Sequence, residues 1–492
     1  MASLDAAIAI HRFGLGARIG EIDNVGDDAR AWLQAQLTEL SSELTGYNLP
    51  STKANISLYY QYLEAQRQEM AAAAPADFAG FVHETRRREA LTRPPGGREA
   101  ENARIAASKA DTSGTAATAS DLYQQMVFAY ANEVSARTRH ASLTPGSFRE
   151  RLVRFWSDHF TVSINKQILI PTGAALEREA IRPHVTGRFE DMLLAVESHP
   201  AMLAYLDNWY SIGPNSYAGS TFDLGLNENL AREILELHTL GVDGGYSQGD
   251  VTEFAKAITG WSIGNPQIQP ERLGEFIFEP IFHEPGSRTI LGQSYPSGGV
   301  GQGQDILVNL ARHPATARHI ARKLCAHFIS DTPPEAAVVD LEAVYNATGG
   351  DLEAVYTALI ARPEMWDGAL TKMRSAEEFV IAAIRALDRP DFDFNFLFAT
   401  LQELGQQPFF APSPAGWPDD VISWSSPNEI RGRLDWSVLY TASFSGETAP
   451  ADLGTDIMAG LMSDYTRTWL GNASNPQQGA ALMLMSPEFQ RR

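Results

Sequence analysis

The spacing of the large side chains constrains this chain more than any other feature of its sequence. Within residues 149–160, a run of side chains recurs at positions i, i+3, i+4, i+7 and i+8: Leu152, Phe155, Trp156, His159 and Phe160. This spacing places them on one face of an α-helix. Residues 227–241 repeat the helical period and end at Gly241, a residue suited to the position after a helix. The pattern predicts a mainly α-helical protein.

Four short segments indicate where helices restart. Each places a proline after a small or basic residue: SHPAM (198–202), RHPAT (312–316), ARPEM (361–365) and MSPEF (485–489). Proline is tolerated in the first turn of a helix, where its missing N–H costs nothing. We therefore expect a multi-helix assembly of helical hairpins.

Residues 276–292 depart from the helical period. Phe276, Phe278 and Phe282 are separated by even steps, Glu284–Ser287 has the composition of a turn, and residues 289–292 follow as TILG. Alternation around a turn is typical of paired strands. One small β-hairpin is therefore expected near 276–292.

The 492 residues exceed the usual size of one domain. We expect an N-terminal helical segment at 1–70 and a main helical domain at 121–390. Between them, residues 71–120 are poor in large apolar side chains, which predicts a flexible low-complexity insertion. Residues 391–492 are expected to form a Pro- and Trp-rich wrap with helices, in which 406–424 is an ordered loop.

Charge and composition exclude several functions. The chain has 39 basic and 60 acidic residues, which gives a net charge of −21. This negative charge argues against binding to nucleic acid or anionic lipid. The sequence contains no run of about 18 apolar residues, so no membrane span is expected. The single cysteine, Cys325, excludes an intrachain disulfide and is expected to be a core residue. Cytoplasmic location is the default expectation, with export in complex with a signal-bearing partner left open.

Residues 227–261 are the stretch richest in polar side chains. On a helix, Arg232 and Glu236 are four residues apart and Glu233 and Glu236 are three apart. Paired carboxylates beside an arginine could hold a metal ion or transfer protons. An ordinary surface ion pair explains the same spacing and is the more common case. His238 lies about 200° around the ideal helix from Glu236, so it does not share that face.

Further candidates are histidines and one lysine in other predicted elements. His159 lies on an apolar helix face, where it is either a hydrogen-bonded core residue or a metal ligand. His283 opens the turn of the predicted hairpin, a frequent place for functional side chains. His319, Lys323 and His327 follow one helix flank at steps of four. They either line a cationic pocket for an acidic substrate or flank the core. We favour the second interpretation, because motif matches of this kind are weak.

Seven blocks in a fixed order resemble one bacterial family. They are HRFGLG (11–16), RERLVRFWSDHFTVS (149–163), REAIRPHVTGRFEDMLLAVESHPAMLAYLDN (178–208), NENLAREILELHTLGVDGGYSQGDVTEFAKAITGW (227–261), HPATARHIARKLCAHF (313–328), APSPAGWP (411–418) and MSPEFQRR (485–492). Through these blocks the chain resembles, and is identified as a member of, the bacterial family catalogued as domain of unknown function 1800. The family usually has a His-Asp pair at the hairpin turn followed by Gly and Lys; here Glu284 and Arg288 replace the Asp and Lys.

The resemblance implies a largely helical fold and no established activity. The genes of this family often neighbour genes for secreted sulfatase-like proteins, which implies a partner by association. Two main hypotheses follow. In the first, the protein is a metal-assisted hydrolase: a divalent metal is held by His159, His238 and His283, Glu233 is the base, and Arg232 and Lys323 are further catalytic candidates. In the second, it is a non-enzymatic scaffold or maturation partner of a secreted sulfatase-like protein. A buried structural network of the same polar groups is a third option.

Overall fold

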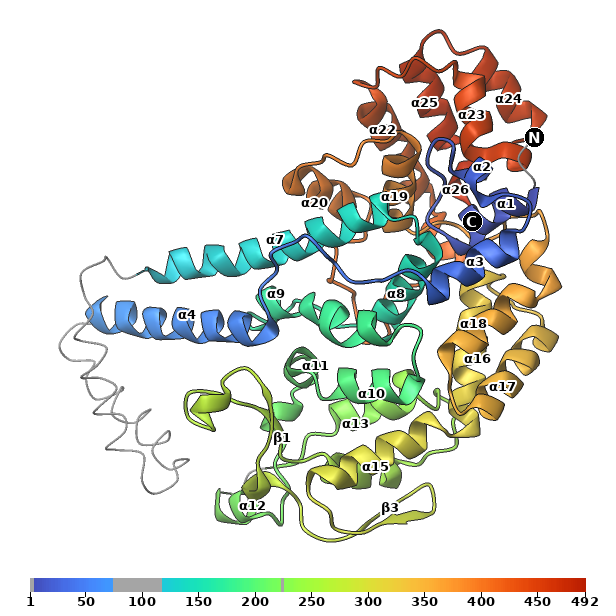
Figure 1. Cartoon of the computed structure of the whole chain (residues 1–492). Helices are drawn as coiled ribbons and strands as arrows, with labels where there is room; N and C mark the ends of the chain where they lie inside the picture. Colours follow the sequence, from blue (N-terminus) through green and yellow to red (C-terminus); the bar gives the residue numbers. More distant parts are fainter. Residues whose placement is uncertain (1–3, 74–116, 223–224) are drawn as a thin grey trace.

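The computed structural model describes residues 4–73, 117–222 and 225–492, which form a mainly α-helical assembly with small β-hairpins (Figure 1). The predicted fold class is therefore confirmed. One apolar core runs through the described ranges and includes residues from Ala6 to Phe489. No helix in the described ranges is long and apolar enough to cross a membrane. The predicted insertion at 71–120 lies, apart from its two ends, outside the described residues.

The N-terminal part contains several short helices and one long one. They are α1 (Leu4–Ile8), the π-helical turn η1 (Ala9–Phe13), α2 (Glu21–Val25), α3 (Ala29–Thr38) and α4 (Thr52–Ala73). Helix α7 (Ala119–Leu143) lies alongside α4, and Figure 1 shows the pair extending from the body as one long hairpin. Thr118 starts α7 with a reciprocal capping box to Asp121.

The central part surrounds helix α8 (Ser147–His159), whose predicted apolar face is buried. The elements that follow it are α9 (Leu169–Thr172), η3 (Glu177–Ile181), η4 (Arg182–His184), α10 (Phe189–Glu197), α11 (Pro200–Tyr205), η5 (Asn208–Tyr210), α12 (Tyr217–Phe222), α13 (Asn229–Glu233), η6 (Ile234–His238) and α14 (Gln248–Ala257). Elements η3 and η6 are π-helical turns, a rare geometry that is frequent at functional sites.

Two antiparallel hairpins stand where one was predicted. Strand β1 (Trp261–Ile263) pairs with β2 (Phe276–Phe278), and β3 (Arg288–Ile290) pairs with β4 (Gln293–Tyr295). Strands β2 and β3 lie on either side of the turn predicted at 284–287, but they pair with β1 and β4 and not with each other. The reason is local: the tight turn at Leu291 and Gly292 has positive φ at both residues, which suits a two-residue hairpin loop. Short 3₁₀ turns η7 (Pro270–Arg272) and η8 (Pro280–Phe282) flank β2.

Stacked helices make up the remainder of the chain. They are α15 (Val300–Ala311), α16 (Pro314–Phe328), α17 (Glu335–Thr348), α18 (Leu352–Ala361), η9 (Pro363–Trp366), α19 (Ala376–Ala386), α20 (Phe394–Glu403), α21 (Val421–Trp424), α22 (Pro427–Thr441), α23 (Pro450–Met458), η10 (Ala459–Leu461), α24 (Asp464–Gly471), α25 (Pro476–Met485) and α26 (Pro487–Gln490). Consecutive helices α16, α17 and α18 pack against one another, as expected of helical hairpins.

The predicted proline restarts are confirmed. Pro200, Pro314, Pro363 and Pro487 each lie in the first turn of a helix. In two of them the preceding histidine caps the helix: the ring Nδ1 of His313 accepts a hydrogen bond from the Ala315 N–H at 3.1 Å. Helix α16 starts in this way, and its register then fixes where Lys323 and His327 point.

Candidate functional site

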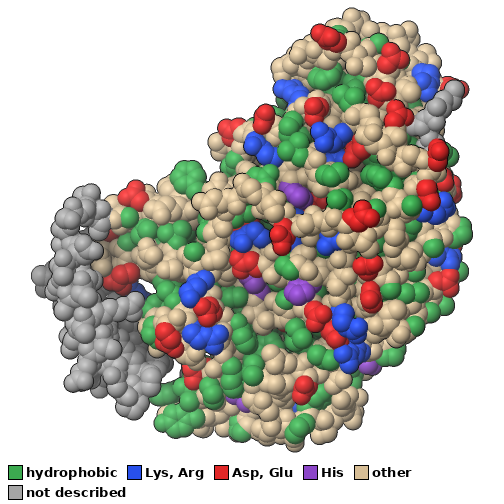
Figure 2. Space-filling model, in the orientation of Figure 1, with side chains coloured by type: hydrophobic (Ala, Val, Ile, Leu, Met, Phe, Trp, Pro, Cys, Tyr) green, Lys and Arg blue, Asp and Glu red, His purple; other side chains and the backbone are tan. Residues whose placement is uncertain are grey.

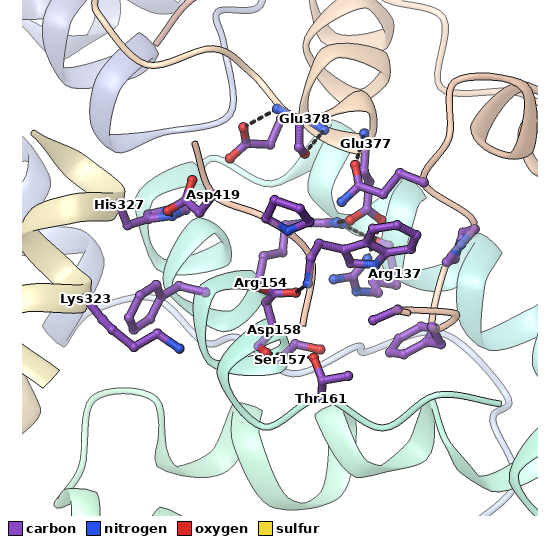
Figure 3. A pocket seen from close by; sticks show the side chains of 18 of the residues that line it. Arg137, Arg154, Ser157, Asp158, Thr161, Lys323, His327, Glu377, Glu378 and Asp419 are labelled. Carbon is purple, nitrogen blue, oxygen red and sulfur yellow. Dashed lines mark hydrogen bonds and ion pairs between the residues drawn. The ribbon is translucent and has the colours of Figure 1, made fainter. Parts of the chain in front are cut away.

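A pocket of about 200 Å³ lies where four segments meet: α8, α16, α19 and the non-helical stretch 406–419. Figure 3 shows polar side chains from these elements converging on it, with Arg137 entering from α7. The predicted ordered loop at 406–424 is therefore one wall of the pocket. On the face drawn in Figure 2, acidic and basic side chains are interspersed, so the net negative charge does not gather there in one patch.

Most charges of the pocket neutralise one another. Glu377 forms ion pairs with Arg137 and with Arg154, the latter at 2.8 Å. On the other side, the guanidinium of Arg492 contacts Glu378 at 2.9 Å and Asp419 at 2.7 Å. Such charge-assisted bonds fix the walls and leave these groups little capacity for a ligand.

The pocket continues into a buried ionic network that holds α7, α8 and η3 together. Arg182 contacts Glu150 at 2.8 Å and Glu177 at 2.6 Å, and Glu177 also accepts from Nε of Arg137 at 2.6 Å. Burial alone would raise the pKa of Glu177, but the charges of Arg137 and Arg182 lower it to about 2. The pocket wall is therefore anchored to the core through Arg137.

Asp158, the penultimate residue of α8, faces the pocket with a perturbed carboxyl group. Its Oδ1 accepts a hydrogen bond from the backbone N–H of Trp417 at 2.8 Å. Burial raises the pKa of Asp158 to about 7; Trp417 and Lys323 oppose this shift, while Asp419 and Glu377 add to it. A carboxyl group with such a pKa can both donate and accept a proton at neutral pH.

Lys323 projects from α16 into the same pocket (Figure 3). Its Nζ donates to Nδ1 of His159 at 3.0 Å. Burial lowers the pKa of Lys323, and the charges of Asp158 and Asp419 partly offset this effect. Asp158 and Lys323 are thus both shifted toward their uncharged forms, the pattern expected of groups that exchange protons.

His159 and His238 are brought together, as the metal hypothesis requires; both ring nitrogens of His159 are hydrogen-bonded, whereas Nε2 of His238 has no hydrogen-bond partner among the described residues. Their ring centroids are 6.1 Å apart, and Nε2 of His159 donates to the backbone oxygen of His238 at 3.1 Å. Burial and the neighbouring charge of Lys323 hold the pKa of His159 well below its usual value, so the ring is neutral. His238 is held in turn by Glu197, at 2.8 Å from Nδ1.

His283 has contacts of its own beside β2. Its Nδ1 lies 2.9 Å from the backbone oxygen of Thr259, and its ring packs on Phe278. Next to it, Glu284 accepts from the backbone N–H of Asn215 at 2.8 Å and from its side-chain amide at 2.6 Å. The longer carboxylate at this turn therefore fastens the 213–216 loop.

Glu233 and Arg232 lie at the end of α13, one turn before His238. Arg232 forms an i,i+4 ion pair with Glu228 at 3.2 Å, so its partner is not the Glu236 that was considered from the spacing. Burial raises the pKa of Glu233, with the charge of His238 opposing and that of Glu236 adding. Neither residue lines the pocket at Asp158.

Within the described residues, no group of three or more His, Cys, Asp or Glu side chains is placed to hold a metal ion together. Of the three predicted metal ligands, the structure places His159 beside His238, and it places His283 against Thr259 and Phe278. The metal ligand set stays a prediction.

Two backbone features shape the pocket. Gly416 has φ of +84°, and a Cβ atom there would lie 2.6 Å from the backbone oxygen of Asp158. Phe409 lines the pocket with φ of +53°, a conformation that costs of the order of 1–3 kcal/mol for a non-glycine residue. The Ile164 N–H donates to the Phe409 oxygen at 2.9 Å and helps to hold it. Strain of this kind is concentrated at functional sites.

Sequence reasoning missed the central residue of this site. Asp158 precedes His159 in the block WSDHF, and no motif marks it. Burial in the folded protein raises its pKa, and Asp419, about 260 positions further along the chain, adds to the shift, so local spacing carries no signal. The step of four did mark Lys323 and His327, which line the pocket, whereas His319 does not line it; the acidic substrate stays a prediction.

Comparison with known proteins agrees with the resemblance seen in the sequence. No curated protein and no solved structure matches the chain. Residues 8–491 match the family described as "Protein of unknown function (DUF1800)". The match spans almost the whole chain and includes every residue that lines the pocket except Arg492. The chain therefore belongs to this family.

Proposed function

We propose that the protein is an enzyme that catalyses an acid–base reaction in the pocket lined by Asp158 and Lys323, and that this reaction is hydrolysis. The observation that carries the proposal is the pairing of a carboxyl group of raised pKa with an amine of lowered pKa in one cavity. Paired shifts of this kind are typical of catalytic sites.

In the proposed reaction Asp158 transfers the proton and Lys323 stabilises the negative charge. The Asp158 carboxylate takes a proton from water as the water oxygen bonds to the electrophilic atom of the substrate. The Lys323 ammonium stabilises the oxyanion that develops. The bond to the leaving group then breaks, and Asp158 returns the proton to that group. The Trp417 N–H holds Asp158 and the His159 ring holds Lys323, so little reorganisation is needed during the reaction.

The test is turnover of chromogenic substrates by matched variants. The panel contains 4-nitrophenyl esters, 4-nitroanilides, and 4-nitrophenyl phosphate and sulfate. We expect hydrolysis of one class, with kcat lowered roughly 10²–10⁴-fold in Asp158→Asn and roughly 10²–10³-fold in Lys323→Met. Lys53→Met, at a 55% exposed lysine paired with Glu275, is the control and should retain wild-type turnover. Equal rates in all four proteins would contradict the proposal.

The other two hypotheses remain separate predictions. A metal-assisted reaction predicts near-stoichiometric metal in protein purified without a histidine tag, lost when His159 and His238 are replaced. A scaffold for a secreted sulfatase-like protein predicts co-purification with that partner in the absence of turnover. Neither is needed for the reaction at Asp158 and Lys323.

A further inference from the structure

The pocket has a size and a composition that limit what it can hold. Its volume of about 200 Å³ is somewhat larger than a cavity of about 150 Å³ that holds benzene. Aromatic side chains of Phe155, Phe409 and Trp417 line it together with the polar groups. A ligand that fills it is therefore small and partly apolar.

Lys323 differs from the other cations of the pocket. The guanidinium groups of Arg137, Arg154 and Arg492 are each in ion pairs with carboxylates. Across the part of the chain that the structure describes, the bond of the Lys323 ammonium is to the neutral ring of His159, and no carboxylate lies within 4.0 Å of its Nζ. An ammonium has three donors. Two of them therefore remain for a ligand, and a negatively charged acceptor suits them best.

We propose that the substrate is an ester or amide of a small apolar carboxylic acid, and that Lys323 and Asp158 bind the carboxylate product in the same pocket. This inference rests on the proposed function and names its substrate class. The water oxygen bonds to the acyl carbon, the bond from that carbon to oxygen or nitrogen breaks, and the alcohol or amine leaves with the proton from Asp158. The acid that remains passes its proton to the ionised Asp158 carboxylate, and the resulting product carboxylate accepts from Lys323.

Asp158 faces the same cavity as Lys323, and once it has taken the proton of the acid it can donate to the product carboxylate. The charged and titratable groups that face Asp158 come from every surrounding element: Arg137 of α7, Arg154 and His159 of α8, Lys323 and His327 of α16, Glu377 and Glu378 of α19, and Asp419 and Arg492 of the C-terminal part.

The probe is benzoate, measured by isothermal titration calorimetry on the full chain. We expect benzoate to bind at least about tenfold more tightly than benzyl alcohol, benzylammonium or inorganic phosphate. Lys323→Met should weaken benzoate at least about tenfold, and Lys53→Met should not. Asp158→Asn keeps an acceptor for the Trp417 N–H and a donor for the ligand. This variant should therefore keep benzoate binding, with a Kd within about twofold of that of the wild type.

Two results would overturn the inference. One is tighter binding of benzylammonium or phosphate than of benzoate, and the other is benzoate binding that Lys323→Met leaves unchanged. Failure of the inference can be told apart from failure of the proposed function. If benzoate binds in a Lys323-dependent way but no ester or anilide is hydrolysed, the proposed enzymatic function is wrong and the anion site stands. If phosphate or sulfate esters are hydrolysed in an Asp158-dependent way but benzoate does not bind, the proposed substrate class is wrong and the enzymatic function stands.

Discussion

Lys323 Nζ lies 3.0 Å from Nδ1 of His159, and Nε2 of the same ring lies 3.1 Å from the backbone oxygen of His238. A neutral imidazole satisfies both contacts: it donates through Nε2 and accepts from the ammonium through Nδ1. His159 therefore holds the charged form of Lys323 in a site that otherwise disfavours charge. Several consequences can be measured.

Replacing His159 should make Lys323 easier to deprotonate. His159→Leu removes the acceptor that favours the ammonium, so the pKa of Lys323, already lowered by burial, should fall further. The pH dependence of Lys323 acetylation by acetic anhydride, followed by mass spectrometry, reports the shift. The control is His319→Leu, whose ring lies 6.2 Å from that of His159 and bonds to the backbone of Leu237. A labelling midpoint equal in wild type and His159→Leu would contradict the role of His159.

Replacing Asp158 should stabilise the protein at high pH. Its pKa is about 7 in the folded protein against 3.8 for the ordinary side chain, so the folded state retains a proton that the unfolded chain has released. This contribution to stability is complete below pH 3.8 and is lost as pH rises through about 7. Three pH units correspond to about 4 kcal/mol, reduced to about 2–4 kcal/mol for a half-buried group. Urea denaturation should find Asp158→Asn more stable than wild type at pH 8 and equal to it at pH 4.

The buried network behind the pocket should be costly to break. Arg182→Met leaves Glu150 and Glu177 without their shared partner, and removal of one member of a buried ion pair costs about 3–5 kcal/mol. Arg318→Met is the matched control because Arg318 is 44% exposed and pairs with Glu335 at the surface, where the cost is about 0–1 kcal/mol. Similar losses in the two variants, measured by urea denaturation at pH 7, would show that the network does not hold the core.

The low pKa of Glu177 predicts how the same network responds to acid. Its folded-state pKa of about 2 lies below the ordinary 4.5, so its stabilising contribution is present above pH 4.5 and is lost as pH falls toward 2. Wild-type protein should therefore lose stability across this range. Arg182→Met should lose less, because part of the interaction is already absent, and an equal acid response in the two proteins would count against the assignment.

A methyl group at position 416 should damage the pocket. Gly416→Ala combines strain at φ of +84° with a Cβ 2.6 Å from the Asp158 backbone oxygen. Gly405→Ala has similar strain at φ of +78°, but its nearest neighbour is 3.9 Å away. Both variants should lose about 1–2 kcal/mol from strain, and only Gly416→Ala should also lose benzoate affinity and turnover. Unimpaired binding in Gly416→Ala would indicate that the Asp158–Trp417 contact does not shape the site.

Most of the fold could be predicted from helical periodicity, because this periodicity depends on side chains only a few positions apart. The buried face of α8 and the four proline restarts could both be predicted locally. Pairing of strands depends on which turn forms, so two hairpins appeared where one was expected. Cys325 is buried, as its apolar helix face indicated.

The site could be predicted only in part. Lys323 and His159 stood out because a cation and a histidine are unusual in apolar helical blocks, and the structure joins them by a hydrogen bond. Asp158 did not stand out, since its neighbours in sequence give it no special environment. A side chain is desolvated by whatever packs on it, and here that is the distant segment with Trp417 and Asp419.

The most direct test of the account is the protonation state of Asp158 itself. Infrared spectra of wild type minus Asp158→Asn, recorded from pH 5 to pH 9, isolate the carbonyl band of a single protonated carboxyl group. We predict that this band is present at pH 5 and is replaced by carboxylate bands with a midpoint near pH 7, as the raised pKa requires. A carboxylate already complete at pH 5 would contradict the assignment of Asp158 as the proton-transferring group.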